Sequence, residues 1–254
     1  MIKQFEYRAE LFVWAVLTLF STIVFLLLWM SVFQGQSSIA GLTVGQIIHY
    51  YLLATIINGV TASHFESWRS REIREGKIDH LMTKPMSYPL QVLLADVGNR
   101  TTYILIIVPL SLLIYSAYIS FYQLESLPLT AFALLQFIGL LIFGYLVEFS
   151  FAIFAVFITF WFESGEGLEH FKWIIISLFS GYLIPVEFMP EWLRMVTQAL
   201  PLKYIYSVPI NILQGKQALD LLDLAYIVMT VIVMFLGLRF MWYAAVKKYT
   251  SAGG

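Results

Sequence analysis

The chain has 254 residues, of which 60% are hydrophobic and 12% are charged, and its formal net charge is −1. Soluble domains are typically about 45–50% apolar and about 25% charged, so this composition indicates an integral membrane protein and excludes most soluble enzymes and nucleic-acid-binding proteins. No cysteine is present, which rules out disulfides, thiolate metal sites and cysteine nucleophiles.

Membrane-spanning helices are the elements that the sequence predicts, because about 20 mostly apolar residues cross about 30 Å of hydrocarbon. The six expected spans are residues 11–33, residues 44–63, the stretch between Arg100 and Glu125, residues 127–162, the stretch between Lys172 and Glu187, and residues 224–246. The third span contains Pro109, where a kink is expected. The fifth span is short, since only 14 uncharged residues separate its flanking charges.

The distribution of basic residues predicts the orientation of these six spans. An even number of crossings places both termini on one side, and twelve of the 15 basic residues fall on that side. They are Lys3, Arg8, Arg69, Arg71, Arg74, Lys77, Lys84, Arg100, Lys172, Arg239, Lys247 and Lys248. Because Lys and Arg accumulate in cytoplasmic loops, we predict that both termini face the cytoplasm.

The largest predicted cytoplasmic loop, residues 65–99, begins with a dense run of charges. Their alternating signs at three- and four-residue spacing predict a solvated helix with internal ion pairs, interrupted at Gly76 and ended by the prolines of residues 84–89. One interpretation is a solvated hairpin between two spans. The other is a docking surface for a cytoplasmic partner, because Ile78, Leu81 and Met82 give the loop a small apolar face.

The segment between the fifth and sixth spans combines four prolines with aromatic residues. Pro190 favours a helix that starts at Glu191, and Trp192 is a residue type that favours the headgroup boundary. We expect a helical hairpin that enters the outer leaflet, since non-helical backbone at membrane depth needs cover from protein or water. The alternative is an ordinary outer loop that lies on the surface.

Two charges fall inside predicted spans, Glu148 in the fourth and Arg239 in the sixth. Buried charge in lipid is usually functional or paired, so the two residues are candidates for an ion pair. Alternatively, Arg239 extends to the inner headgroups. The four histidines show no metal-ligand spacing, and we expect no metal site.

Sequence motifs of catalysis are missing from the chain. The sequence contains no G-x-x-x-x-G-K-[ST] phosphate loop and no H-E-x-x-H zinc motif. It also has no G-x-S-x-G nucleophile elbow. We therefore expect no catalytic residue and no bound cofactor in this chain.

Two motifs carry a resemblance to a known family. Residues 74–87, Arg-Glu-Gly-Lys-Ile-Asp-His-Leu-Met-Thr-Lys-Pro-Met-Ser, resemble the cytoplasmic Glu-Gly segment of type-2 ATP-binding-cassette (ABC) permeases of the exporter type. Residues 180–185, 188–193, 200–204 and 215–216 are similar to the C-terminal signature of the same family. The two matches and the six-span layout together cover nearly the whole chain, and the order and spacing of the motifs make the resemblance specific.

The resemblance implies an all-α permease with six spans, N-in and C-in, as a single domain over residues 1–254. Residues 1–10 would be an interfacial segment, residues 65–99 the loop with the coupling helix, and residues 184–220 the extracytoplasmic re-entrant region. The implied ATPase-coupling residues are Arg71, Glu72, Arg74, Glu75, Gly76, Lys77, Ile78, Asp79 and Lys84. The implied residues of the re-entrant hairpin are Pro185, Glu187, Pro190, Glu191 and Trp192.

The partners are implied by the same resemblance. Two cytoplasmic ABC ATPase subunits would bind ATP and Mg, and a second six-span permease, identical or homologous, would complete the pathway in the lipid bilayer. Export across a bacterial cytoplasmic membrane, inner or plasma, is the expected activity.

Other functional classes stay open from the residues alone. In a stand-alone proton-coupled secondary transporter, Glu148 would carry the proton, although no inverted repeat relates the two halves of the chain. A membrane enzyme and a scaffold that anchors a partner are further alternatives.

Overall fold

The structure is a computed structural model that describes residues 8–123, 126–162 and 166–249. Within these ranges the chain is helical, with one isolated bridge between Ile39 and Leu42. The long helices are α2 (Arg8–Phe33), α3 (Val44–Thr61), α6 (Tyr88–Tyr122), α7 (Ala131–Ile158), α8 (Glu166–Phe179) and α11 (Leu221–Lys248). The short ones are α4 (Glu66–Arg74), α5 (Asp79–Met82), η1 (Val186–Phe188), α9 (Glu191–Ala199), η2 (Pro201–Tyr204) and α10 (Ser207–Leu213). The expected interfacial segment at residues 1–10 lies mostly outside the described residues.

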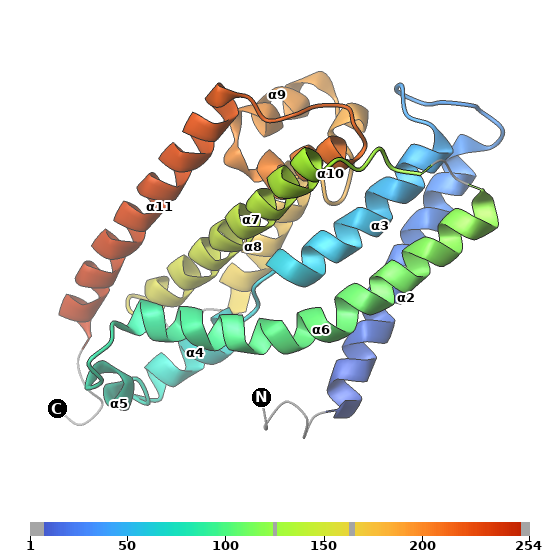
Figure 1. The fold of residues 1–254 in the computed structure, drawn as a ribbon. Helices are drawn as coiled ribbons and strands as arrows, with labels where there is room; N and C mark the ends of the chain where they lie inside the picture. Colours follow the sequence, from blue (N-terminus) through green and yellow to red (C-terminus); the bar gives the residue numbers. More distant parts are fainter. Residues whose placement is uncertain (1–7, 124–125, 163–165, 250–254) are drawn as a thin grey trace.

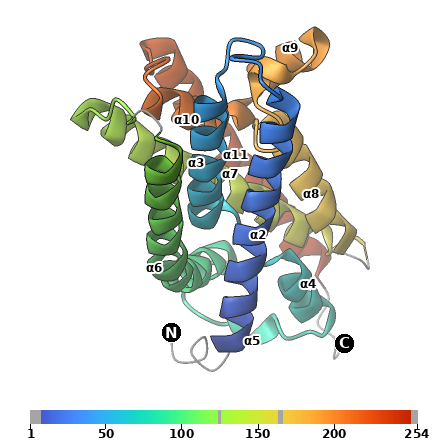
Figure 2. The same ribbon diagram turned by 90° about the vertical axis from the view of Figure 1, so that its right-hand side faces the viewer.

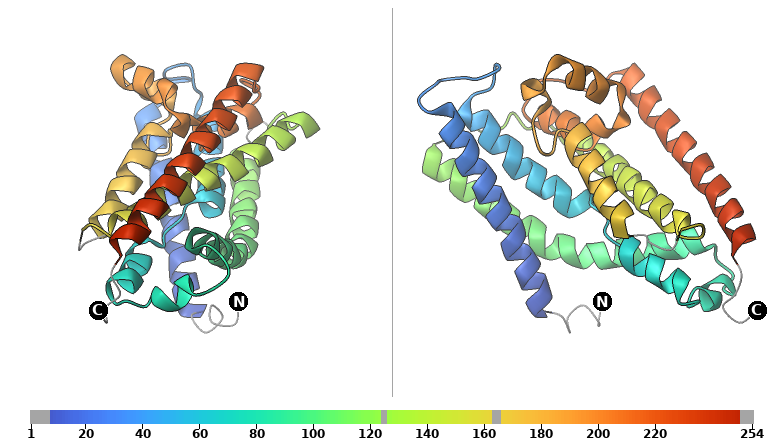
Figure 3. Two further views of the ribbon diagram at one scale, coloured as in Figure 1. Left: turned by 90° about the vertical axis from the view of Figure 1, so that its left-hand side faces the viewer. Right: turned by 180° about the vertical axis from the view of Figure 1, so that it is seen from behind.

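The long helices form an elongated bundle with a distinct set of short helices at each end (Figure 1). Helices α4 and α5 lie at one end, which we call the α4 end, together with the beginning of α2 and the end of α11 (Figures 1 and 2). Helix α9 lies at the opposite end, the α9 end. Helices α2 and α11 occupy opposite sides of the bundle, with α7 and α8 between them (Figure 3).

Helix α7 is the centre of the bundle. It packs against α3, α4, α8, α10 and α11, and 61% of its most apolar window is buried. Helices α6 and α11 are equally apolar, but only 11% and 6% of their windows are buried. Since a helix that is apolar on all sides faces either protein or lipid, α7 is the buried core and the other two present apolar surface to the bilayer.

In the part of the chain that the structure describes, three helices are long and apolar enough to cross a membrane: residues 104–122 of α6, all of α7 and all of α11. They match the third, fourth and sixth predicted spans, and Pro109 lies inside α6 as expected. Helices α2 and α3 coincide with the first two predicted spans, and residues Phe20–Phe33 of α2 form an apolar helical stretch. Helix α8 has 14 residues, about 21 Å at 1.5 Å per residue, so it is shorter than a full crossing.

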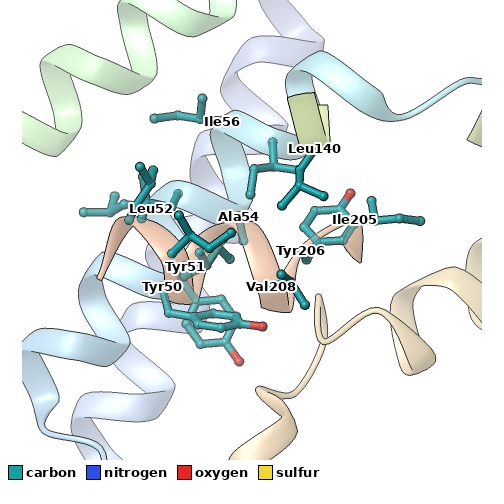
Figure 4. Packing of buried hydrophobic residues seen from close by; sticks show 14 of the residues in the cluster. Tyr50, Tyr51, Leu52, Ala54, Ile56, Leu140, Ile205, Tyr206 and Val208 are labelled. Carbon is teal, nitrogen blue, oxygen red and sulfur yellow. The ribbon is translucent and has the colours of Figure 1, made fainter. Parts of the chain in front are cut away.

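At the α9 end, the chain turns back into the bundle after α9. Ile205, Tyr206 and Ile210 are almost fully buried, and Figure 4 shows the first two packed with Leu140 of α7 and Tyr50 of α3. Within the predicted re-entrant region, α10 is thus the deeply buried helix. Helix α9 is amphipathic and exposes Trp192, as its sequence predicted for an interfacial residue.

Candidate functional site: buried charges beside the α4–α5 loop

The α4–α5 loop is shaped by the Glu-Gly pair of its motif. Helix α4 ends at Arg74, and Gly76 adopts φ +69°. The amide of Gly76 donates to the carbonyl of Ile73, and that of Lys77 donates to the carbonyl of Glu72 at 2.9 Å. This pattern is a Schellman cap, in which the left-handed residue is usually glycine. The motif therefore encodes the sharp reversal between α4 and α5.

One side of the loop packs against the bundle. Ile73 and Ile78 are buried with Phe149 and Ile153 of α7 and with Tyr88 of α6. Ile78, which the sequence placed on an apolar docking face, is 0% exposed and belongs to the chain's own core. Its role is to seat the loop on α7.

The other side of the loop is charged and exposed. Of the residues assigned to ATPase coupling, six are exposed: Arg71, Arg74, Glu75, Lys77, Asp79 and Lys84. Lys77 pairs with Glu75, and Arg69 pairs with Glu72 at 2.7 Å, so the internal ion pairs predicted for this loop are present. The Asp79 carboxylate accepts a hydrogen bond from the Tyr249 hydroxyl at 2.6 Å, which joins α5 to the residue after α11. We call the six exposed residues, Arg71, Arg74, Glu75, Lys77, Asp79 and Lys84, the charged face of the loop.

The first residue of α4 is anchored by a buried set of charges. The ammonium group of Lys172 on α8 pairs with the carboxylate of Glu66 and lies 3.7 Å from that of Glu148 on α7. It also donates a hydrogen bond to the carbonyl of Ser63. All three charged side chains are at most 5% exposed. We call Glu66, Glu148 and Lys172 the buried triad.

The buried triad carries one positive and two negative charges when all its members are ionised. Desolvation raises the pKa of Glu66 above its ordinary value, and the neighbouring Lys172 opposes that rise in part. A buried charge without a partner costs several kcal/mol, so Lys172 is the residue on which the local charge balance depends.

A second polar group extends this anchorage to α6. Asp96 accepts hydrogen bonds from Ser63 at 3.2 Å and from the Tyr145 hydroxyl at 2.9 Å. Arg100 lies 3.7 Å from Asp96 and donates to the carbonyl of Val60. One polar network thereby joins α6 and α7 to the end of α3 and to the segment that precedes α4.

Helix α8 supplies a third set of contacts to the same segment. The hydroxyl of Ser67 donates to the carboxylate of Glu169, and that carboxylate also lies 3.9 Å from the imidazole of His64. With the buried triad, these contacts give the start of α4 polar connections to both α7 and α8.

The sequence marks Glu148 and Arg239 as candidates for an ion pair within the predicted spans. In the structure Glu148 pairs with Lys172, and Arg239 is exposed on α11. No ion pair between Glu148 and Arg239 occurs among the described residues. In the sequence, Lys172 serves only as a charge that marks the boundary of a predicted span. It lies six residues after the start of α8, whereas Glu148 lies ten residues before the end of α7, so no shared spacing marks the pair in the sequence.

Two of the predicted hairpin residues, Glu187 and Glu191, line a cavity of about 890 Å³ at the α9 end. Pro185 and Pro190 immediately precede η1 and α9, and Glu191 pairs with Arg194 in the first turn of α9. Glu187 accepts a hydrogen bond from Asn211 of α10 at 3.3 Å. Trp192 is exposed and does not line this cavity.

The described residues contain no group of three or more His, Asp or Glu side chains that could hold a metal ion.

The fold and the buried charges define a helical integral membrane protein in which a charged loop is attached to the core helix through ion pairs.

The family of this membrane protein follows from its match to a family profile. Residues 19–253 match the profile described as ABC-2 family transporter protein. The chain therefore belongs to the ABC-2 transporter family and is a transport component of the permease type. No curated protein and no solved structure matches the chain.

Proposed function

We propose that this chain is the membrane-spanning subunit of an ATP-driven exporter and forms half of its substrate pathway. In this proposal it has six spans with both termini in the cytoplasm of a bacterium. Two ABC ATPase subunits, which carry ATP and Mg, dock on the charged face of the loop, and a second permease, identical or homologous, supplies the other half.

The buried triad is the observation that carries the proposal. It joins the first residue of α4 to α7 and α8, so a displacement of α4 by a docked partner would act directly on the core helix. A solvated connector between two spans would not require charges that are buried and paired in this way. A partner shifts the permease between states only through its differential binding to them.

The orientation has support from the charges at the α4 end. The last turn of α11 carries Lys247 and Lys248, and α4 carries Arg71 and Arg74 in its last turn. All of them lie at the same end of the bundle (Figure 1). The positive-inside rule assigns this end to the cytoplasm.

A proton-coupled secondary transporter that uses Glu148 is the alternative. A proton carrier must reach water from each side in turn, whereas Glu148 is 4% exposed and lies beside the fixed positive charge of Lys172. This arrangement favours a structural role for Glu148. Uptake or efflux by vesicles that contain this chain alone, driven by a pH gradient, would support the alternative and contradict the exporter.

The test of the exporter is purification of the native complex from its own membranes in a mild detergent. The wild-type chain should retain an ATPase with an ATP-binding motif. The double variant Glu75→Ser/Lys77→Ser keeps the Gly76 cap but removes the Glu75–Lys77 ion pair from the charged face of the loop. We expect it to retain about tenfold less ATPase, which corresponds to a loss of about 1.4 kcal/mol of binding free energy.

The matched control is Glu191→Ser/Arg194→Ser, which removes an exposed ion pair at the opposite end of the molecule. It should retain the ATPase at the wild-type level. Equal losses in the two double variants, or a wild-type chain that retains no ATPase, would overturn the docking assignment.

A further inference from the structure

An apolar groove lies on the lipid-facing side of the bundle near the α4 end. Its volume is about 550 Å³, within the range of about 300–1,000 Å³ that is usual for ligand sites. Three helices line it, with Leu90 and Leu93 from α6, Leu146 and Phe149 from α7, and Met234 and Leu238 from α11. The groove is not part of the buried triad or of the charged face of the loop.

The arrangement of the helices explains why this space is left open. Helices α6 and α11 are near each other at the α4 end and diverge away from it (Figure 1). At the α4 end they are joined by Tyr88, which stacks on Trp242 at 5.3 Å between ring centroids. Trp242 also contacts Phe157 of α7 at 5.3 Å, so aromatic rings close this end of the groove.

The groove carries one positive charge, the guanidinium of Arg239. None of the ion pairs among the described residues involves Arg239. Arg239 lies nine residues before the end of α11, about 13 Å along the helix axis, and an arginine at this depth reaches toward the headgroups. An unpaired arginine in a largely apolar groove favours an anionic partner from outside the chain.

We propose that this groove binds one anionic phospholipid from the leaflet at the α4 end. Its phosphate would pair with Arg239, since guanidinium groups bind phosphate through two parallel hydrogen bonds. One of its acyl chains would lie along the leucines of α6 and α11. Basic pockets between transmembrane helices on the cytoplasmic side are known to take such headgroups.

A bound phospholipid would act as a structural lipid for the coupling region. The groove includes Ser87, the residue immediately before α6 and five positions after the end of α5. The lipid would thus connect α11 to the first turn of α6 beside the α4–α5 loop. This role rests on the family assignment and does not depend on ATP coupling.

The test is native mass spectrometry of the full-length chain in detergent with two added phospholipids of identical acyl chains, phosphatidylglycerol and phosphatidylethanolamine. The wild-type chain should retain one phosphatidylglycerol in preference to phosphatidylethanolamine. Arg239→Gln should lower phosphatidylglycerol retention about fivefold, the factor expected from one cation near an anionic headgroup. It should lower phosphatidylethanolamine retention less, because the ammonium group of that lipid offsets the charge of its phosphate.

Two further variants distinguish this site from general attraction to lipid. Lys248→Gln removes an exposed charge at the end of the same helix and should leave retention unchanged. Leu90→Trp partly fills the groove and should lower the retention of both lipids. The proposal is wrong if the wild-type chain does not discriminate between the lipids, or if Lys248→Gln weakens retention as much as Arg239→Gln does.

Discussion

The α4 end and the α9 end of the bundle are attached to the long helices by different interactions. At the α4 end, the segment before α4 is fixed by ion pairs, with Lys172 between Glu66 and Glu148. At the α9 end, tyrosine hydroxyls of α3 donate to backbone carbonyls: Tyr50 to Gly181 at 2.7 Å and Tyr51 to Leu183 at 3.0 Å.

This difference separates two kinds of rigidity. The attachment at the α4 end depends on charge balance, because removing one member leaves another buried charge unpaired. The attachment at the α9 end depends on steric complementarity. Its neutral hydrogen bonds each contribute only about 1 kcal/mol, so close packing of side chains supplies the remaining stability. The α4 end should therefore respond to changes of charge and the α9 end to changes of volume.

The largest effect is expected from Lys172→Met, which removes the shared cation of the buried triad. Two buried carboxylates would be left without a partner, and such a change costs about 3–5 kcal/mol. The apparent free energy of unfolding of the detergent-solubilised chain measures it. Lys248→Met, at an exposed lysine, is the control, and equal stability of the two variants would contradict the role given to the triad.

The next largest effect should come from Gly181→Ala at the α9 end. Gly181 has φ +89°, and an added Cβ would lie 2.7 Å from the Tyr50 hydroxyl. A non-glycine residue held in this conformation costs about 1–3 kcal/mol. Gly139→Ala in α7, where no atom lies within 4 Å, should cause no loss in the same unfolding assay. A Gly181→Ala variant as stable as the control would show that fit does not limit the α9 end.

The smallest effect is expected from Glu66→Gln, less than about 1 kcal/mol at neutral pH, because the remaining Glu148 balances Lys172. Its dependence on pH is the sharper test. Burial raises the pKa of Glu66, so the folded chain holds this proton to a higher pH than the unfolded chain. Wild-type stability should therefore fall relative to Glu66→Gln as pH rises through the ordinary pKa of glutamate.

Unfolding of both proteins at about pH 3.5 and about pH 7.5, below and above the ordinary pKa of glutamate, measures this difference. If the stability of the wild type relative to Glu66→Gln stayed constant or rose with pH, the folded chain would instead stabilise the charged form of Glu66.

Much of the fold follows from local features of the sequence. The long run with Glu148 as its one charge predicts α7, and the helix begins where the hydroxyl of Thr130 accepts a hydrogen bond from the amide of Ala133 at 3.1 Å. The Glu-Gly pair predicts the break after α4. These features act within one or two turns of chain, and sequence alone is sufficient to identify them.

The site depends on contacts that no local pattern encodes. Glu66 and Lys172 are separated by more than 100 positions, and helix packing alone brings them together. The sequence instead suggests Arg239 as the partner of Glu148, because each is a charged residue within a predicted apolar span. The inward position of Ile78 was missed for the same reason, since an apolar residue in a charged loop gives no indication of which surface it covers.

The hydrogen bond between Tyr249 and Asp79 has a consequence for biogenesis. Tyr249 follows α11 in the chain, so it leaves the ribosome after every helix described here. During synthesis, α5 therefore lacks this contact until the last helix has been inserted. In a nascent chain stalled before α11, the α4–α5 loop would lack its hydrogen bond to Tyr249. If an ATPase subunit docks on this loop as proposed, its binding would be delayed until α11 and Tyr249 have been synthesised.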